Sequence, residues 1–213
     1  MLKKLWLASG LALAVSGTVY ADGFYAGLGM GIGGLTDKLS TNLPGQSSSI
    51  SNISYMGGGI AGYDFNLSSR YNLGLEVFLT GSAAKAVVNN NTNGSSLSIK
   101  SAFNYGFRVL PGYKFAPDTI GYLILGVSQN NFKLSDNGVY GNVGDSFYKT
   151  GYQIGLGGTS NIWTPNWFVR VDVIYSGYGS HSSNGVTNTG VPNIYRNSLN
   201  TVEGMLSFIY HFS

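Results

Sequence analysis

Three residues of this chain have types and a spacing that suit nucleophilic catalysis. His181 and Ser183 stand two positions apart in the stretch SGYGSHSSNGVTN, so both side chains would project from one face if a strand extends that far. Glu203 follows towards the C-terminal end. A hydroxyl, an imidazole and a carboxylate are groups from which such catalysts are built. The competing interpretation is a Ser-, Asn- and Gly-rich surface loop that happens to contain a histidine, and we favour it. We expect no enzymatic activity.

Other site chemistry has less support in the sequence. Histidine occurs only at positions 181 and 211 and cysteine is absent, so we expect no metal site and no cofactor. The glycine-rich run GLGMGIGG has the composition of a phosphate-binding loop, but no helix follows it. Its glycines are better explained as space for bulky neighbours. The net charge is only +3 and the Lys and Arg residues are scattered, which argues against a nucleic-acid partner.

The N-terminal segment indicates export. In MLKKLWLASGLALAVSGTVYA, two lysines precede a short apolar run, and small residues stand at the −3 and −1 positions. This is the pattern of a secretory signal peptide, and the apolar run is too short for a membrane-spanning helix. We therefore predict a signal peptide over residues 1–21, cleaved before Asp22, and a single domain over residues 22–213.

The composition of the remaining chain is unusual for a soluble domain. Only 10% of residues are charged, whereas soluble domains average about 25%. Aromatic residues make up 14% of the chain and glycine occurs 32 times. No second long apolar run is present, which excludes a helical membrane protein.

Strand-like segments alternate with two kinds of connection. Long polar stretches near 35–52, 84–96, 130–146 and 178–197 alternate strictly with short turns. Transmembrane barrels combine long outer loops with short periplasmic turns in this way. The fold predicted is therefore all-β: an eight-stranded antiparallel up-and-down transmembrane β-barrel with four long extracellular loops. Its strands are expected over residues 24–33, 53–65, 71–81, 101–115, 120–129, 148–162, 167–177 and 199–212.

The alternation within these strands predicts which face is wet. In 71–81 the odd positions are apolar and the even ones include Glu76, and in 167–177 valines oppose Arg170 and Asp172. An exported, charge-poor barrel should turn the apolar face to lipid and the charges to the lumen. The lumenal charge network predicted in this way comprises Glu76, Lys100, Arg108, Arg170, Asp172 and Glu203. The aromatic girdle predicted beside the short turns comprises Tyr63, Phe65, Tyr71, Tyr113, Phe115, Trp163, Trp167 and Phe212.

The chain resembles the small eight-stranded outer-membrane barrels, such as the membrane domain of outer-membrane protein A and the opacity-type proteins. The resemblance rests on FYAGLGMGIG, on TGYQIGLGG with WTPNWFVRVDVIYSGYG, and on the closing LSFIYHF. It implies a bacterial outer-membrane location and, through alternating Phe208, Tyr210 and Phe212, recognition by the barrel-assembly machinery.

A second resemblance concerns the possible catalytic residues. The run from His181 to Asn184 is similar to the His-x-Ser-Asn motif of the lipid A 3-O-deacylase family. That resemblance would make Ser183 the nucleophile, His181 the general base and Glu203 its orienting partner. The distance from Ser183 to Glu203 is longer than in that family, and Glu203 has the lumenal parity rather than the lipid-facing one.

We therefore expect a structural, surface-interaction or narrow porin-like protein of the outer membrane. The lumenal charges either form a salt-bridge network that fills the barrel or act as a gate for ions. The expected partners are outer-membrane lipids and a host or surface ligand bound by the loops. Cations in or beside the loops could also pair with lipopolysaccharide phosphates, namely Lys38, Lys85, Lys133 and Arg196. Pro111, inside an expected strand, predicts a bulge or a position near the rim.

Overall fold

The computed structural model describes residues 20–41, 47–82, 85–90, 95–116, 118–137, 144–162, 164–186 and 192–212. The predicted signal peptide lies outside these residues, except for Tyr20 and Ala21 at the start of the first strand. The strands are β1 Tyr20–Thr41, β2 Ser47–Asn66, β3 Tyr71–Ser82, β4 Lys85–Asn90, β5 Ser95–Ala116, β6 Thr119–Asn137, β7 Gly144–Asn161, β8 Trp167–Val186 and β9 Pro192–Phe212. No helix long and apolar enough to cross a membrane occurs among the described residues.

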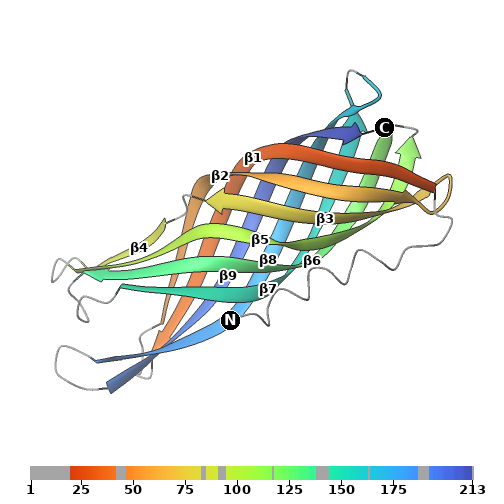
Figure 1. Cartoon of the computed structure of the whole chain (residues 1–213). Helices are drawn as coiled ribbons and strands as arrows, with labels where there is room; N and C mark the ends of the chain where they lie inside the picture. Colours follow the sequence, from red (N-terminus) through yellow and green to blue (C-terminus); the bar gives the residue numbers. More distant parts are fainter. Residues whose placement is uncertain are drawn as a thin grey trace, which may run out of the picture.

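The strands form one closed antiparallel barrel (Figure 1). Their order is β3-β2-β1-β9-β8-β7-β6-β5-β4, and pairing between β3 and β5 closes the sheet. Both β3 and β4 pair with β5, first over Phe103–Tyr113 and then over Ser95–Lys100, so they are successive segments of one barrel strand. The described residues therefore form an eight-stranded barrel, which confirms the predicted fold.

The strands are longer than the sequence predicted. Those other than β3 and β4 contain 18 to 22 residues, and β1 continues to Thr41 while β2 already begins at Ser47. Much of each polar stretch predicted as a loop is thus strand, and the predicted loop bounds were too wide. In these polar stretches Ser, Asn and Gly occupy both faces, so no alternation of apolar residues marks them as strands. Backbone hydrogen bonds between strands form without such alternation.

β3 shows the predicted arrangement, with apolar side chains on the outer face and charged or polar side chains on the inner face. Val77 and Leu79 expose 55% and 54% of their surface, whereas Glu76 and Thr80 expose 1% and 2%. β8 repeats this arrangement, with Val171 and Val173 outside and charged residues inside. A water-soluble barrel would have the opposite arrangement, because apolar surface drives burial in water.

Aromatic rings surround the barrel beside the short turns. They form three groups, each joining two neighbouring strands, with contacting ring centroids 4.6–5.5 Å apart: Phe24 with Tyr63 and Phe65, Tyr71 with Tyr113 and Phe115, and Trp167 with Tyr210 and Phe212. Seven predicted girdle residues are among them, whereas Trp163 lies outside the described residues. Phe24 and Tyr210 had not been predicted, although they have the outward parity of their strands.

A second aromatic belt lies towards the long-loop end. Exposed Tyr55, Tyr105 and Tyr175 each stand eight residues from an inner-belt ring on the same strand, namely Tyr63, Tyr113 and Trp167. Eight residues span about 27 Å of strand. At a tilt of about 40° this corresponds to a height of about 21 Å, close to the apolar band of about 25 Å in outer-membrane barrels. The two belts therefore mark both faces of the hydrocarbon layer.

Beyond the outer belt the barrel divides into two sheets. In the described residues, pairing of β7 with β8 ends at Tyr152 and Gly177, and pairing of β2 with β3 ends at Met56 and Ser82. The remaining ladders continue, so β2-β1-β9-β8 and β4-β5-β6-β7 extend outward as two separate leaves (Figure 1).

Pro111 causes no bulge. β5 keeps one register with β3 across Pro111, which lies opposite Leu73, and its shifts against β6 fall at Ser101/Asn104 and Lys114/Ala116. Around Pro111 itself, the β5–β6 ladder lacks the rungs at Leu110 and Pro111. The backbone N–H that Pro111 lacks thus interrupts the hydrogen-bond ladder, but the strand register stays the same.

Glycines on the inner face accommodate large side chains. A Cβ at Gly157 would collide with the Tyr122 ring and with the Asp172 carboxylate. We predict that Gly157→Leu prevents formation of the compact, heat-modifiable band on gels, because overpacking adds to the loss of a buried hydrogen bond. Gly204→Ala is the matched control, since a Cβ there meets no atom within 4 Å. Equal folded fractions for the two variants would contradict the prediction.

Candidate functional site: the filled lumen

A buried ionic cluster lies inside the barrel. Glu76 of β3 and Arg108 of β5 occupy directly opposed positions, and their Oε1 and Nη1 atoms lie 3.4 Å apart. Arg170 of β8 crosses the lumen to the Glu76 carboxylate, and its Nε lies 2.7 Å from Oδ2 of Asp172. All four side chains are 1–3% exposed. Closure of the barrel brings the neighbouring Arg170 and Asp172 of β8 to the Glu76–Arg108 pair, 94 residues from Glu76 to Arg170 in sequence.

Neutral side chains complete this cluster. The hydroxyl of Tyr25 donates to Glu76 Oε2 at 3.0 Å, and the hydroxyl of Tyr122 donates to Asp172 Oδ1 at 2.7 Å. Arg108 Nε donates to Gln153 Oε1 at 2.8 Å, and its guanidinium lies 3.7 Å from the ring centroid of Phe78. Buried charges remain ionised only when they are paired and hydrogen-bonded in this way.

Apolar side chains fill much of the remaining interior. Sequence reasoning missed them, although they have the inward parity of their strands. They form three clusters: Tyr25, Ile60, Phe78 and Ile209; Leu110, Tyr122, Ile124 and Ile174; and Leu35, Phe132, Tyr178 and Leu199. The last lies on the side of the long loops. An eight-stranded barrel is just wide enough for side chains to fill, and these clusters leave the ionic groups little water.

The prediction for Lys100 was wrong. Ser101 and Asn104 both face the lumen, with 5% and 4% of their surface exposed, although they are three residues apart. The register shift of β5 between them reverses the alternation of the strand. Lys100 is therefore exposed on the outer surface, where it lies opposite Lys133 of β6. Glu203 does face the lumen, 4% exposed, and accepts a hydrogen bond from Thr201.

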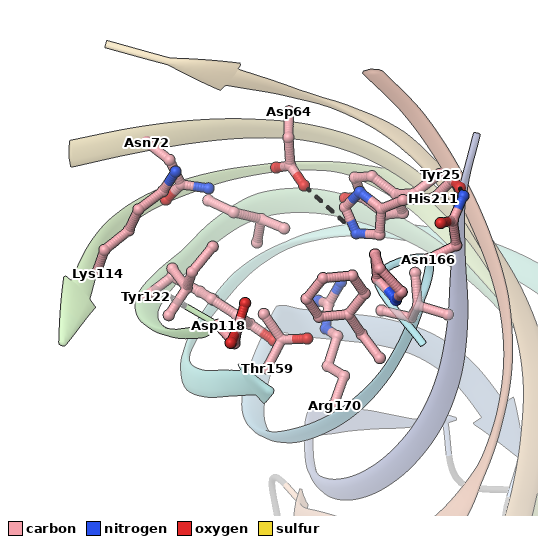
Figure 2. A pocket seen from close by; sticks show the side chains of 15 residues that line it. Tyr25, Asp64, Asn72, Lys114, Asp118, Tyr122, Thr159, Asn166, Arg170 and His211 are labelled. Carbon is pink, nitrogen blue, oxygen red and sulfur yellow. Dashed lines mark hydrogen bonds and ion pairs between the residues drawn. The ribbon is translucent and has the colours of Figure 1, made fainter. Parts of the chain in front are cut away.

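A cavity of about 350 Å³ opens at the end of the short turns (Figure 2). His211 lies between the rings of Tyr25 and Phe168, with centroids 5.3 Å and 4.7 Å away, and its Nε2 is 3.9 Å from Asp64 Oδ2. Arg170 lines this cavity as well as belonging to the ionic cluster. Water from the end of the short turns can thus reach the ionic cluster at Arg170.

Strand register separates the three residues considered for catalysis. His181 and Ser183 of β8 lie opposite Asn197 and Tyr195 of β9, and their side chains lie outside the described part of the chain. Glu203 lies opposite Ile174, six residues along β9 from Asn197, which corresponds to about 20 Å. A hydrogen bond between His181 and Glu203 would need atoms about 3 Å apart. The register therefore gives the catalytic hypothesis no support.

An apolar outer surface between two aromatic belts, together with charged side chains enclosed by a closed sheet, defines an integral outer-membrane β-barrel protein. The chain matches the family model described as outer membrane protein beta-barrel domain over residues 5–200, and it belongs to that family. The family places it in the bacterial outer membrane. No curated protein sequence matches it significantly.

Three solved structures share its fold. Neisserial surface protein A is 15% identical with a TM-score of 0.50, covering 90% of this chain and 99% of that chain. OprG of Pseudomonas aeruginosa is 12% identical with a TM-score of 0.54, covering 89% and 97%. The outer membrane protease OmpT of Escherichia coli is 11% identical with a TM-score of 0.54, covering 93% and 99%. At these identities the likeness concerns the fold alone.

Proposed function

We propose that this protein is a closed structural barrel that contributes to envelope integrity and surface contacts, rather than a pore or an enzyme. The observation that supports this most directly is the Glu76 carboxylate held between two guanidinium groups in a lumen filled by side chains. The proposal includes export by a signal peptide cleaved before Asp22. It also includes assembly through the alternating aromatic residues at the C-terminus and contact of the outer strands with a host or surface ligand.

Conductance tests the closed state. We predict that the wild-type protein in planar bilayers gives no discrete currents. An open path for ions would require the ion pairs of the cluster to separate, which would leave a buried charge without its partner. Arg108→Ala removes one side of the Glu76 bridge and is expected to give small, flickering currents. Discrete, long-lived wild-type currents that change with Glu76→Gln would overturn the closed barrel in favour of the narrow channel.

The corrected position of Lys100 supports a lipid partner. Lys100 and Lys133 line one open groove on the outer surface with the exposed rings of Tyr55 and Phe103. Two cations directly opposite each other in a sheet repel, and an anion between them removes that cost. The groove lies at the outer belt, at the depth of the lipid phosphates. Its rings suit acyl chains and its ammonium groups suit the phosphates of lipopolysaccharide.

Titration of lipid A into protein nanodiscs tests this groove. Lys100→Gln combined with Lys133→Gln is expected to weaken binding by at least about 100-fold, because each of the two lost hydrogen bonds to a charged group contributes about 1.5–3 kcal/mol and 1.4 kcal/mol corresponds to a factor of ten. Arg70→Gln is the control, since Arg70 is exposed at a short periplasmic turn. Equal affinity of the double variant and the control would remove the lipopolysaccharide contact. Lys38, Lys85 and Arg196 lie on strands, with side chains outside the described part.

Catalysis on lipid A has a direct test. Acyl-chain analysis of lipid A from expressing cells should give the same composition for the wild type and Ser183→Ala. A 3-O-deacylated product that is lost in the variant would make the protein an enzyme.

A further inference from the structure

The outer groove beside Lys100 and Lys133 lies where the barrel wall is interrupted. The ladder between β2 and β3 ends at Met56 and Ser82, and no ladder joins β2 to β4 among the described strands. Both Met56 and Ser82 line the groove, although Met56 has the inward parity of β2 and is only 7% exposed. An outer groove that is lined by an inward-facing residue reaches into the wall itself.

The neighbouring strand β5 is irregular at the same level. Its pairing with β3 ends at Phe103, and its pairing with β4 begins at Lys100. Its register against β6 shifts between Ser101 and Asn104. The groove thus lies where the ladders on both sides of the barrel strand formed by β3 and β4 are interrupted. Local opening of a sheet costs less where backbone pairing is incomplete.

Small residues give the groove its depth. Gly57 of β2 and Gly81 of β3 lie opposite each other with outward parity, and both line the groove together with Ala102 of β5. The rings of Tyr55 and Phe103 stand beside them and are 82% and 60% exposed. The groove has a volume of about 510 Å³, within the range of about 300–1,000 Å³ of ligand pockets. An unbranched hydrocarbon chain suits such a surface.

The order of groups along β5 matches the orientation of a lipid in the outer leaflet. β5 runs from the outer side towards a short turn, so Lys100 lies outward of Phe103 by three residues, or about 10 Å of strand. Lys133 shares the rung of Lys100, and Tyr105 of the outer belt follows Phe103 on the membrane side. The cations thus lie on the side of the lipid phosphates, and the rings and small residues lie on the side of the acyl chains.

We propose that one lipid A molecule occupies this groove and completes the barrel wall. Its acyl chain lies over Gly57, Gly81 and Ala102, and its phosphate binds the two lysines. This inference rests on the lipopolysaccharide contact proposed above and adds the position of the chain and its role in the wall. Because lipid tails elsewhere are equally apolar, the hydrophobic effect does not select this position. The phosphate contact and close packing over the glycines select it.

Leucine in place of a groove glycine tests the position of the chain. A Cβ at Gly57 would lie 3.5 Å from its nearest neighbour, an ordinary contact, whereas the rest of a leucine side chain would occupy the groove. Gly57→Leu should weaken lipid A binding in nanodiscs about tenfold, since overpacking costs about 1–3 kcal/mol and 1.4 kcal/mol is a factor of ten. Gly81→Leu, whose Cβ would lie 3.8 Å from Phe103, should repeat this result from β3.

Gly59→Leu is the matched control. Gly59 has the same outward parity on β2, does not line the groove, and would place a Cβ 3.7 Å from its nearest neighbours. Its affinity for lipid A should equal that of the wild type. Equal affinity of Gly57→Leu, Gly81→Leu and this control would overturn the position of the chain. If Lys100→Gln with Lys133→Gln still weakened binding, the lipopolysaccharide contact itself would stand.

Amide exchange measured by mass spectrometry tests the role of the lipid in the wall. At about ten times its dissociation constant, lipid A should slow exchange of residues 54–57 about tenfold if their opening requires its release. Gly59→Leu should keep this protection, and Gly57→Leu should lose most of it at the same lipid concentration. The disaccharide bisphosphate without acyl chains should give no protection. Bound lipid A that leaves the exchange unchanged, or equal protection by the disaccharide, contradicts the proposal.

Discussion

Replacing Glu76 by glutamine should lower the free energy of unfolding by about 3–5 kcal/mol, because it leaves two buried guanidinium groups without their shared counter-ion. Arg108 and Arg170 both bind this carboxylate, and Tyr25 donates a hydroxyl proton to it. Urea titration of the protein refolded in lipid vesicles, followed by tryptophan fluorescence, measures the change.

Two further variants separate charge pairing from polar burial. Asp118→Asn removes an exposed carboxylate and should change stability by less than about 0.5 kcal/mol. Combining Glu76→Gln with Arg108→Met removes the cation whose printed ion pair is with Glu76, while Arg170 keeps Asp172, and should recover part of the loss. A Glu76→Gln protein as stable as the wild type would show that this cluster contributes nothing to stability.

Arginine at Val171 should destabilise the protein by about 2–4 kcal/mol, the cost of this side chain on the lipid face of a barrel at the bilayer midplane. Val171 exposes 54% of its surface and lies midway along β8 between the belt residues Trp167 and Tyr175. In a water-soluble barrel an exposed valine would accept arginine at almost no cost. The variant therefore measures which solvent surrounds the barrel.

Ser182→Arg is the matched control. Ser182 is exposed on the same strand, seven residues beyond Tyr175 and outside the apolar band. We expect its free energy of unfolding in vesicles to stay within about 0.5 kcal/mol of the wild type. Similar small effects at both positions would contradict the placement of the hydrocarbon layer between the two belts.

Strand parity was sufficient to predict the wall of the barrel. Valines and leucines alternate with Glu76 in β3 and with Arg170 and Asp172 in β8, and the direction of each side chain follows from the two-residue period of a strand. The low charge content then indicated which face meets lipid. These are local properties, which can be read from a single segment without reference to the rest of the sequence.

The contacts inside the lumen could not be predicted in this way. Glu76 and Arg170 are 94 residues apart, and only the register of the closed sheet decides that they meet. Lys100 shows a second limit, because one register shift reversed the alternation and no residue type nearby signals it.

The division of the sheet beyond the outer belt has a mechanical consequence. At Gly177 and Ser180 the register of β8 shifts against β9, and Gly179 adopts a positive φ of 67°. The two leaves share no ladder there, and the Lys149 side chain reaches across to the carbonyl oxygen of Ser180. The outer strands therefore have fewer ladder hydrogen bonds holding them together than the closed membrane part has. Amide protons on the outer strands should exchange by local opening, independently of global unfolding.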